Sequence, residues 1–153
     1  MKSSKGFLKR FWLLAIISIF FLIIISGCAK KEAIKSLQDE EVLKERVTSY
    51  WNHKIKREFD KVYPYEDPLF RKRISLIAYI RQYDSPAMSY TSFKVQDIKM
   101  NDAEHAEVKI KTDVRLKVPG AKAFEHDTEL TEQWVMIDRE WYHVPKGNKS
   151  PNQ

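Results

Sequence analysis

The sequence has little cysteine and little glycine. It holds one cysteine, four glycines and four histidines in 153 residues. A single cysteine excludes an intramolecular disulfide and a cysteine-based metal cage. Four dispersed glycines do not form a glycine-rich phosphate-binding loop, and the histidines show no HExxH pattern or i, i+4 pair. We therefore predict no metal site and no cofactor.

Acidic residues are absent from the first 27 positions, which hold four of the 27 basic residues. The formal net charge of +6 belongs mostly to this segment, because the remainder carries 23 basic against 21 acidic side chains. A nucleic-acid-binding surface needs an excess of lysine and arginine gathered on one face. The near-balance of the remainder therefore predicts no nucleic-acid partner.

The N-terminal segment has the composition of an export signal. A basic stretch, "MKSSKGFLKR", precedes an apolar run from Phe11 to Ile25 that only Ser18 interrupts. This run of 15 residues is shorter than the roughly 20 that a membrane-spanning helix needs. Ser26 and Gly27 then lead into Cys28, the one cysteine.

The residues "ISGC" at the end of this run resemble the lipobox of bacterial lipoproteins. The resemblance implies cleavage between Gly27 and Cys28 and acylation of the Cys28 thiol, which would attach the protein to a membrane. The alternative is an uncleaved anchor helix. In either case the domain lies outside the cytoplasm. Since Ala29 is not the aspartate that often causes inner-membrane retention, the outer membrane is favoured in a host with two membranes.

The residues after Cys28 divide into a charged tether and a helical region. Residues 28–41 are poor in large apolar side chains and hold Ser36 and Asp39 as alternative helix N-caps. From Val42, apolar residues recur every three or four positions, which predicts one amphipathic helix. Its apolar stripe consists of Leu43, Val47, Tyr50, Trp51, Ile55, Phe59, Val62 and Tyr63.

A second helix is predicted after "YEDP", where Asp67 and Pro68 form a cap and first-turn pair. Its apolar face consists of Phe70, Ile74, Ile77 and Ile80, and "YDSP" ends it.

Beyond Pro86 the apolar period changes from about 3.6 to 2, which predicts β-strands. Even positions from 106 to 118 are apolar or small while odd positions from 107 to 117 are charged, and Pro119-Gly120 marks a turn. A second long strand follows from Phe124 to Met136. An earlier strand, "YTSFKVQDIKM", changes apolar parity between Val95 and Ile98, which predicts a bulge. "WYHV" forms a last short strand.

Two helices followed by about four antiparallel strands predict an α+β domain with helices on one face of a bent sheet. This order and the segments "RVTSYWNHKIKREFDKVYPY" and "EQWVMIDREWYHV" resemble the nuclear transport factor 2-like superfamily, which shares its cone-shaped fold with ketosteroid isomerase and scytalone dehydratase. The closing turn departs from the family pattern because Arg139 stands where glycine is common. We therefore expect a type I or longer turn there.

In enzymes of that superfamily the concave sheet face and first helix line a pocket. The residues of this chain that could line one are Tyr50, Thr112, His126, Glu132 and Trp134. His126 and Glu132 share strand parity and could abstract a proton next to a carbonyl. Six extended residues separate them by about 20 Å, however, so they could act together only across a strong bend. Structural roles at the sheet rim are the alternative.

The sequence divides into four parts: a signal peptide (1–27), a lipidated tether with a helix start (28–41), the α+β domain (42–145) and a disordered tail (146–153). The first hypothesis is a non-enzymatic lipoprotein that binds a protein partner or a small apolar ligand. A second is a small pocket enzyme of the isomerase, dehydratase or cyclase kind, and a third is a structural subunit of an envelope or secretion assembly. A deep, closed pocket with a carboxylate or imidazole at its floor would favour the second.

Overall fold

The computed structural model describes residues 38–146. The chain forms two units, Met1–Asp39 and Glu40–Gln153, and the domain described below belongs to the second. The predicted signal peptide, tether residues 28–37 with Ser36, the cleavage and acylation site at Gly27 and Cys28, and residues 147–153 of the predicted tail lie outside the described residues. Among residues 38–146, no helix is both long enough and apolar enough to span a bilayer.

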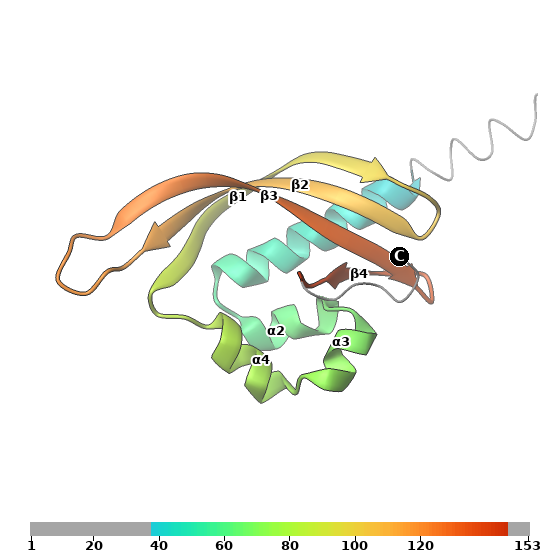
Figure 1. The fold of residues 1–153 in the computed structure, drawn as a ribbon. Helices are drawn as coiled ribbons and strands as arrows, with labels where there is room; N and C mark the ends of the chain where they lie inside the picture. Colours follow the sequence, from blue (N-terminus) through green and yellow to red (C-terminus); the bar gives the residue numbers. More distant parts are fainter. Residues whose placement is uncertain (1–37, 147–153) are drawn as a thin grey trace, which may run out of the picture. The chain divides into compact units, whose positions relative to one another are not determined.

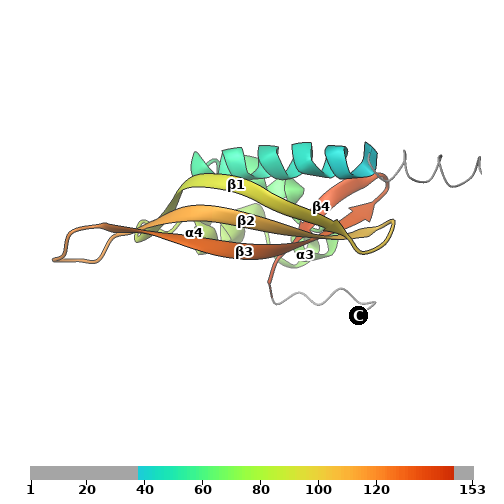
Figure 2. The ribbon, with the colours of Figure 1, turned by 90° about the horizontal axis from the view of Figure 1, so that it is seen from above.

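The second unit is an α+β domain, as predicted. The first described helix covers residues 38–55. The other helices are α2 (Phe59–Val62), the 3₁₀ helix η1 (Tyr63–Tyr65), α3 (Pro68–Arg73) and α4 (Leu76–Tyr83), and the strands are β1 (Met88–Met100), β2 (His105–Leu116), β3 (Phe124–Ile137) and β4 (Glu140–Val144). The strands form one antiparallel sheet in the order β1-β2-β3-β4. The helices lie against one face of this curved sheet (Figures 1 and 2).

The core lies between the first helix and the sheet. Tyr50 and Trp51 of this helix are buried, and the Trp51 ring stacks on Phe93 of β1 with a centroid distance of 5.8 Å. The predicted alternation of β2 is confirmed, because all its even positions from Ala106 to Val114 are buried. Burial of the valine and isoleucine side chains among them contributes about 1.5–3 kcal/mol each, which helps to hold helix and sheet together.

The prediction of one uninterrupted helix from Val42 to Tyr63 is wrong. The first helix ends in a Schellman motif, in which the Glu58 amide donates to the His53 carbonyl and the Arg57 amide donates to the Lys54 carbonyl. Arg57 adopts φ 61° and donates from its guanidinium to Asp84 and to the Ser85 carbonyl. These contacts hold a left-handed backbone that arginine rarely adopts. Asp39 lies within the first helix and is not its N-cap.

The second predicted helix is also divided in two. Asp67 caps α3 as expected, its side chain accepting from the Leu69 amide at 2.8 Å. Ile74 is extended, however, and the Ser75 side chain caps α4 by accepting from the Ala78 amide at 3.3 Å. A serine inside an apolar helical pattern can start a new helix because its hydroxyl satisfies an amide that lacks an intrahelical partner.

The pairing of the strands departs from a complete, regular ladder in β1 and at β4. The predicted bulge in β1 is confirmed, with a register shift between Val95 and Asp97. β4 pairs with β3 only from Gln133 onward. The earlier part of β3 forms, with β2, a hairpin that projects past the helices (Figures 1 and 2), and Phe124 near its tip is half exposed.

The expected type I or longer turn between β3 and β4 is wrong. Ile137 pairs with Glu140, which leaves Asp138 and Arg139 as a two-residue loop. Both have positive φ, 52° and 68°, as a type I′ turn requires. The strand pairing sets this geometry, because the twist of a type I′ turn matches that of the strands it connects.

Candidate functional site

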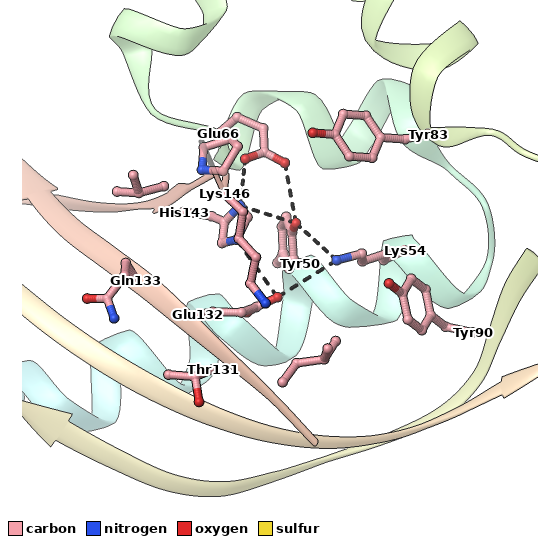
Figure 3. A pocket seen from close by; sticks show the side chains of 13 residues that line it. Tyr50, Lys54, Glu66, Tyr83, Tyr90, Thr131, Glu132, Gln133, His143 and Lys146 are labelled. Atoms are coloured by element: carbon pink, nitrogen blue, oxygen red, sulfur yellow. Dashed lines mark hydrogen bonds and ion pairs between the residues drawn. The ribbon is translucent and has the colours of Figure 1, made fainter. Parts of the chain in front are cut away.

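A pocket of about 750 Å³ lies between the first helix, α4 and the sheet (Figure 3). Its polar floor is formed by Tyr50, Lys54, Glu66, Glu132 and His143. These residues come from the first helix, the residue after η1, β3 and β4, so the pocket exists only when all of these elements are assembled. Ring and aliphatic side chains of Tyr83, Tyr90 and Leu130 also line it.

Glu66 is the centre of the floor cluster. Its carboxylate accepts from the hydroxyl groups of Tyr79 at 2.6 Å and Tyr50 at 3.3 Å through Oε1, and from His143 Nδ1 at 2.6 Å through Oε2. The backbone fixes this arrangement, since residues 66 and 143 form a parallel β-bridge and the His143 carbonyl accepts from the Asp67 amide at 2.8 Å. Glu66 is 1% exposed. Its charge is thus held by three donors instead of water.

Glu132 forms the second acidic part of the floor. Its Oε2 accepts from the indole nitrogens of Trp51 at 3.1 Å and Trp134 at 3.4 Å. Its Oε1 lies 3.8 Å from both Lys54 Nζ and His143 Nε2. These two separations exceed hydrogen-bond distance, so neither is a direct hydrogen bond, and a water or ligand atom between the groups would bridge them.

The imidazole of His143 lies between the two carboxylates. Because an ionised carboxylate only accepts hydrogen bonds, His143 Nδ1 carries a proton and donates the hydrogen bond to Glu66. This leaves Nε2 directed toward Glu132. An imidazole oriented by a carboxylate, with its other nitrogen toward a cavity, is the arrangement that general acid–base catalysis uses.

Lys54 is the partly buried cation of the floor. Its side chain is 14% exposed, and its ammonium donates to the Tyr50 hydroxyl at 3.3 Å. Burial lowers the pKa of Lys54, an effect that the charges of Glu132 and Glu66 oppose. Burial, followed by the charge of Glu66, raises the pKa of Tyr50 and of Tyr79, so both phenols stay protonated and donate.

The structure places the predicted pocket residues in three different environments. Tyr50 and Glu132 line the pocket, and Trp134 supports it through its indole bond to Glu132. Thr112 is buried elsewhere, where its hydroxyl donates to the Ser92 carbonyl at 2.6 Å beside a register shift of β1. His126 is exposed on the projecting part of β3, opposite Val114. It does not line the pocket, because neither β4 nor a helix covers that part of the strand.

Three floor residues escaped sequence reasoning. Lys54 follows Tyr50 by four positions and Trp51 by three, so it lies on the same helix face as these apolar residues. A lysine on the apolar stripe was a usable signal of a buried functional group. His143 shares strand parity with buried Trp141, which was a weaker signal. Glu66 stands in a helix-breaking segment, and no periodicity marks it. Within residues 38–146, no group of three or more His, Cys, Asp or Glu side chains is arranged to hold a metal ion.

No protein-family model matches the chain, and no curated protein matches it. Among solved structures, the chain is similar to a SEC-C motif containing protein from Rhodopseudomonas palustris, with 14% identity, TM-score 0.45 and coverage of 62% of this chain and 69% of that chain. It is similar to an NTF-2-like protein of unknown function from Shewanella oneidensis MR-1, with 14% identity, TM-score 0.47 and coverage of 69% and 94%. It is also similar to a "putative dehydratase from the NTF2-like family" of Streptomyces avermitilis, with 9% identity, TM-score 0.49 and coverage of 72% and 98%.

Proposed function

We propose that the protein is a cell-envelope lipoprotein, anchored through Cys28, whose α+β domain binds a small molecule in the pocket. The observation that carries the binding function is the floor cluster of buried Glu66, Glu132 and His143, with partly buried Lys54 beside them. Taking these ionisable groups out of water costs several kcal/mol per ion, and apolar residues of similar volume are often as stable or more so. A ligand-binding role accounts for their presence at the floor of a cavity.

The composition of the pocket defines the class of ligand. Tyr83, Tyr90 and Leu130 offer apolar surface, while Glu132, His143 and Lys54 offer hydrogen-bonding groups at the floor. Such a site fits a compact molecule with an apolar body and one polar end. This refines the sequence hypothesis of an apolar ligand.

Binding is tested by the indole resonances of Trp51 and Trp134, whose nitrogens contact Glu132.

The second candidate function is acid–base catalysis in the same pocket. The observation that favours it is the Glu66–His143 pair. His143 Nδ1 lies 2.6 Å from Glu66 Oε2, and His143 Nε2 is directed toward Glu132 Oε1, 3.8 Å away. In this function His143 Nε2 takes a proton from the carbon next to a carbonyl, and the positive charge of Lys54 stabilises the enolate oxygen. This chemistry belongs to the isomerase, dehydratase or cyclase kind.

Proton abstraction is tested by the exchange of the α-hydrogens of cyclohexanone in D₂O, followed by NMR. We expect the wild-type protein to accelerate the exchange and His143→Gln to lower the acceleration at least about 100-fold, the usual contribution of a general base. The matched control is His126→Gln, because His126 is exposed on the projecting hairpin. Equal exchange rates in the wild type and His143→Gln would exclude this second function.

The anchor is tested by the mass of the full chain extracted from membranes. We expect a mature protein that begins at Cys28 and carries acyl chains, and we expect Cys28→Ala to remain unprocessed and unacylated. Ser26→Ala is the matched control, since it keeps a small residue before the cleavage site. An unmodified mass for the wild type, or normal processing of Cys28→Ala, would contradict the lipoprotein assignment.

A further inference from the structure

Lys54 is held in a fixed position at the pocket floor. Its Nζ lies 4.3 Å from the centroid of Trp51, 4.9 Å from that of Tyr50 and 5.0 Å from that of Tyr90. The Tyr50 hydroxyl accepts one of its hydrogen bonds. A lysine side chain ordinarily samples many rotamers in solvent, whereas these contacts orient the amine toward the pocket (Figure 3).

The groups around Lys54 can remove and return a proton. Glu132 Oε1 lies 3.8 Å from Lys54 Nζ, beyond direct hydrogen-bond distance, so a proton moves from the ammonium to this carboxylate through one bridging water, and His143 Nε2 lies at the same distance from that oxygen. Burial lowers the pKa of Lys54, which increases the fraction of free amine at a given pH. A desolvated lysine beside an acid–base group is the usual form of a lysine nucleophile.

We propose that Lys54 binds carbonyl compounds covalently, forming an imine with an aldehyde or ketone that carries an apolar body. The proposal rests on the proposed function, because it requires that a small molecule enter the pocket. It defines the ligand's polar end as a carbonyl carbon. The apolar body then lies against Tyr90 and Leu130, which line the same pocket.

The reaction conserves atoms and charge. The Lys54 ammonium gives a proton to Glu132, and the free amine forms an N–C bond while the carbonyl π electrons move to oxygen. This oxygen takes one proton from the nitrogen and a second from Glu132, the C–O bond breaks, and water leaves. The product is a protonated imine and one water, formed from one carbonyl and one ammonium group. The carboxylate of Glu132 faces the cationic imine, and addition of water reverses the steps.

The test is reductive trapping with benzaldehyde and sodium cyanoborohydride, using the full chain in mild detergent. Peptide mapping by mass spectrometry then locates the benzyl group. We expect Lys54 to be labelled several times faster than Lys56 and Lys44, which are exposed lysines in the same molecule. Lys54→Arg keeps the positive charge and Lys54→Met keeps the apolar stem. In both variants we expect no label at position 54 and no faster labelling of the other lysines.

Benzyl alcohol separates this inference from the proposed function, since it has the same ring and no carbonyl. If benzyl alcohol shifts the Trp51 and Trp134 indole resonances but Lys54 is labelled no faster than Lys56, the imine inference is wrong and the binding pocket stands. If benzyl alcohol causes no shift and Lys54 is labelled no faster than Lys56, both are contradicted. Selective labelling of Lys54 supports both.

Discussion

Replacing Glu66 by leucine is expected to lower the free energy of unfolding by about 3–5 kcal/mol, the cost of breaking a buried charged network by removing one partner. The leucine leaves the hydroxyl groups of Tyr50 and Tyr79 and the Nδ1 of His143 without their acceptor. Since these donors are buried, water does not replace the lost hydrogen bonds at low cost. Urea denaturation of the full chain, followed by near-ultraviolet circular dichroism, measures the change.

Two variants control for the substitution itself. Glu45 is exposed on the first helix, and Glu45→Leu is expected to change the free energy of unfolding by no more than about 0.5 kcal/mol. Glu66→Gln keeps an acceptor oxygen and the shape of the side chain. Its destabilisation is therefore expected to fall between that of Glu45→Leu and that of Glu66→Leu. A Glu66→Leu protein as stable as Glu45→Leu would show that the floor cluster does not hold the pocket together.

The floor cluster also explains why the pocket needs the whole domain. Glu66 and His143 are 77 positions apart, and Trp51 and Glu132 are 81 apart. Each bond ties a helix or its adjoining loop to the C-terminal half of the sheet. The cluster thus connects the two layers of the domain, and loss of one bond disturbs both the shape of the pocket and the packing of the layers.

The sequence predicted the regular elements better than their interruptions. The alternation in β2 was visible because one face of the strand is buried and the other is wet. The helix break at Arg57 was not visible, because its left-handed backbone is held by Asp84 and Ser85, far along the chain. The turn at Arg139 was predicted wrongly because strand pairing fixed a geometry that the local residues do not favour.

The site was predictable only where a polar residue interrupts an apolar face. Glu132 was identified because it shares the parity of Trp134 on β3, and Tyr50 because it lies on the helical stripe. His126 has the same parity as Glu132, but parity does not reveal where β4 ends and the strand loses its cover. Glu66 and His143 form a pair through tertiary structure alone, so no spacing in the sequence connects them.

Two tryptophans report directly on the pocket floor. The indole nitrogens of Trp51 and Trp134 donate to Glu132 Oε2, so a molecule that contacts Glu132 changes the electronic environment of both indole protons. The indole nitrogen of Trp141 is buried and has no hydrogen-bond partner among the described residues, and Trp141 does not line the pocket. It serves as a reference inside the same domain.

The central claim is that the buried polar cluster is a ligand-binding site. The most direct test is a titration of the ¹⁵N-labelled full chain with small molecules that combine an apolar ring and one polar group, followed by the indole ¹H–¹⁵N resonances. We expect bound molecules to shift the Trp51 and Trp134 resonances more than that of Trp141, and Glu132→Gln to weaken binding at least about tenfold, the equivalent of 1.4 kcal/mol. Binding that leaves Trp51 and Trp134 unshifted, or that Glu132→Gln does not weaken, would contradict the claim.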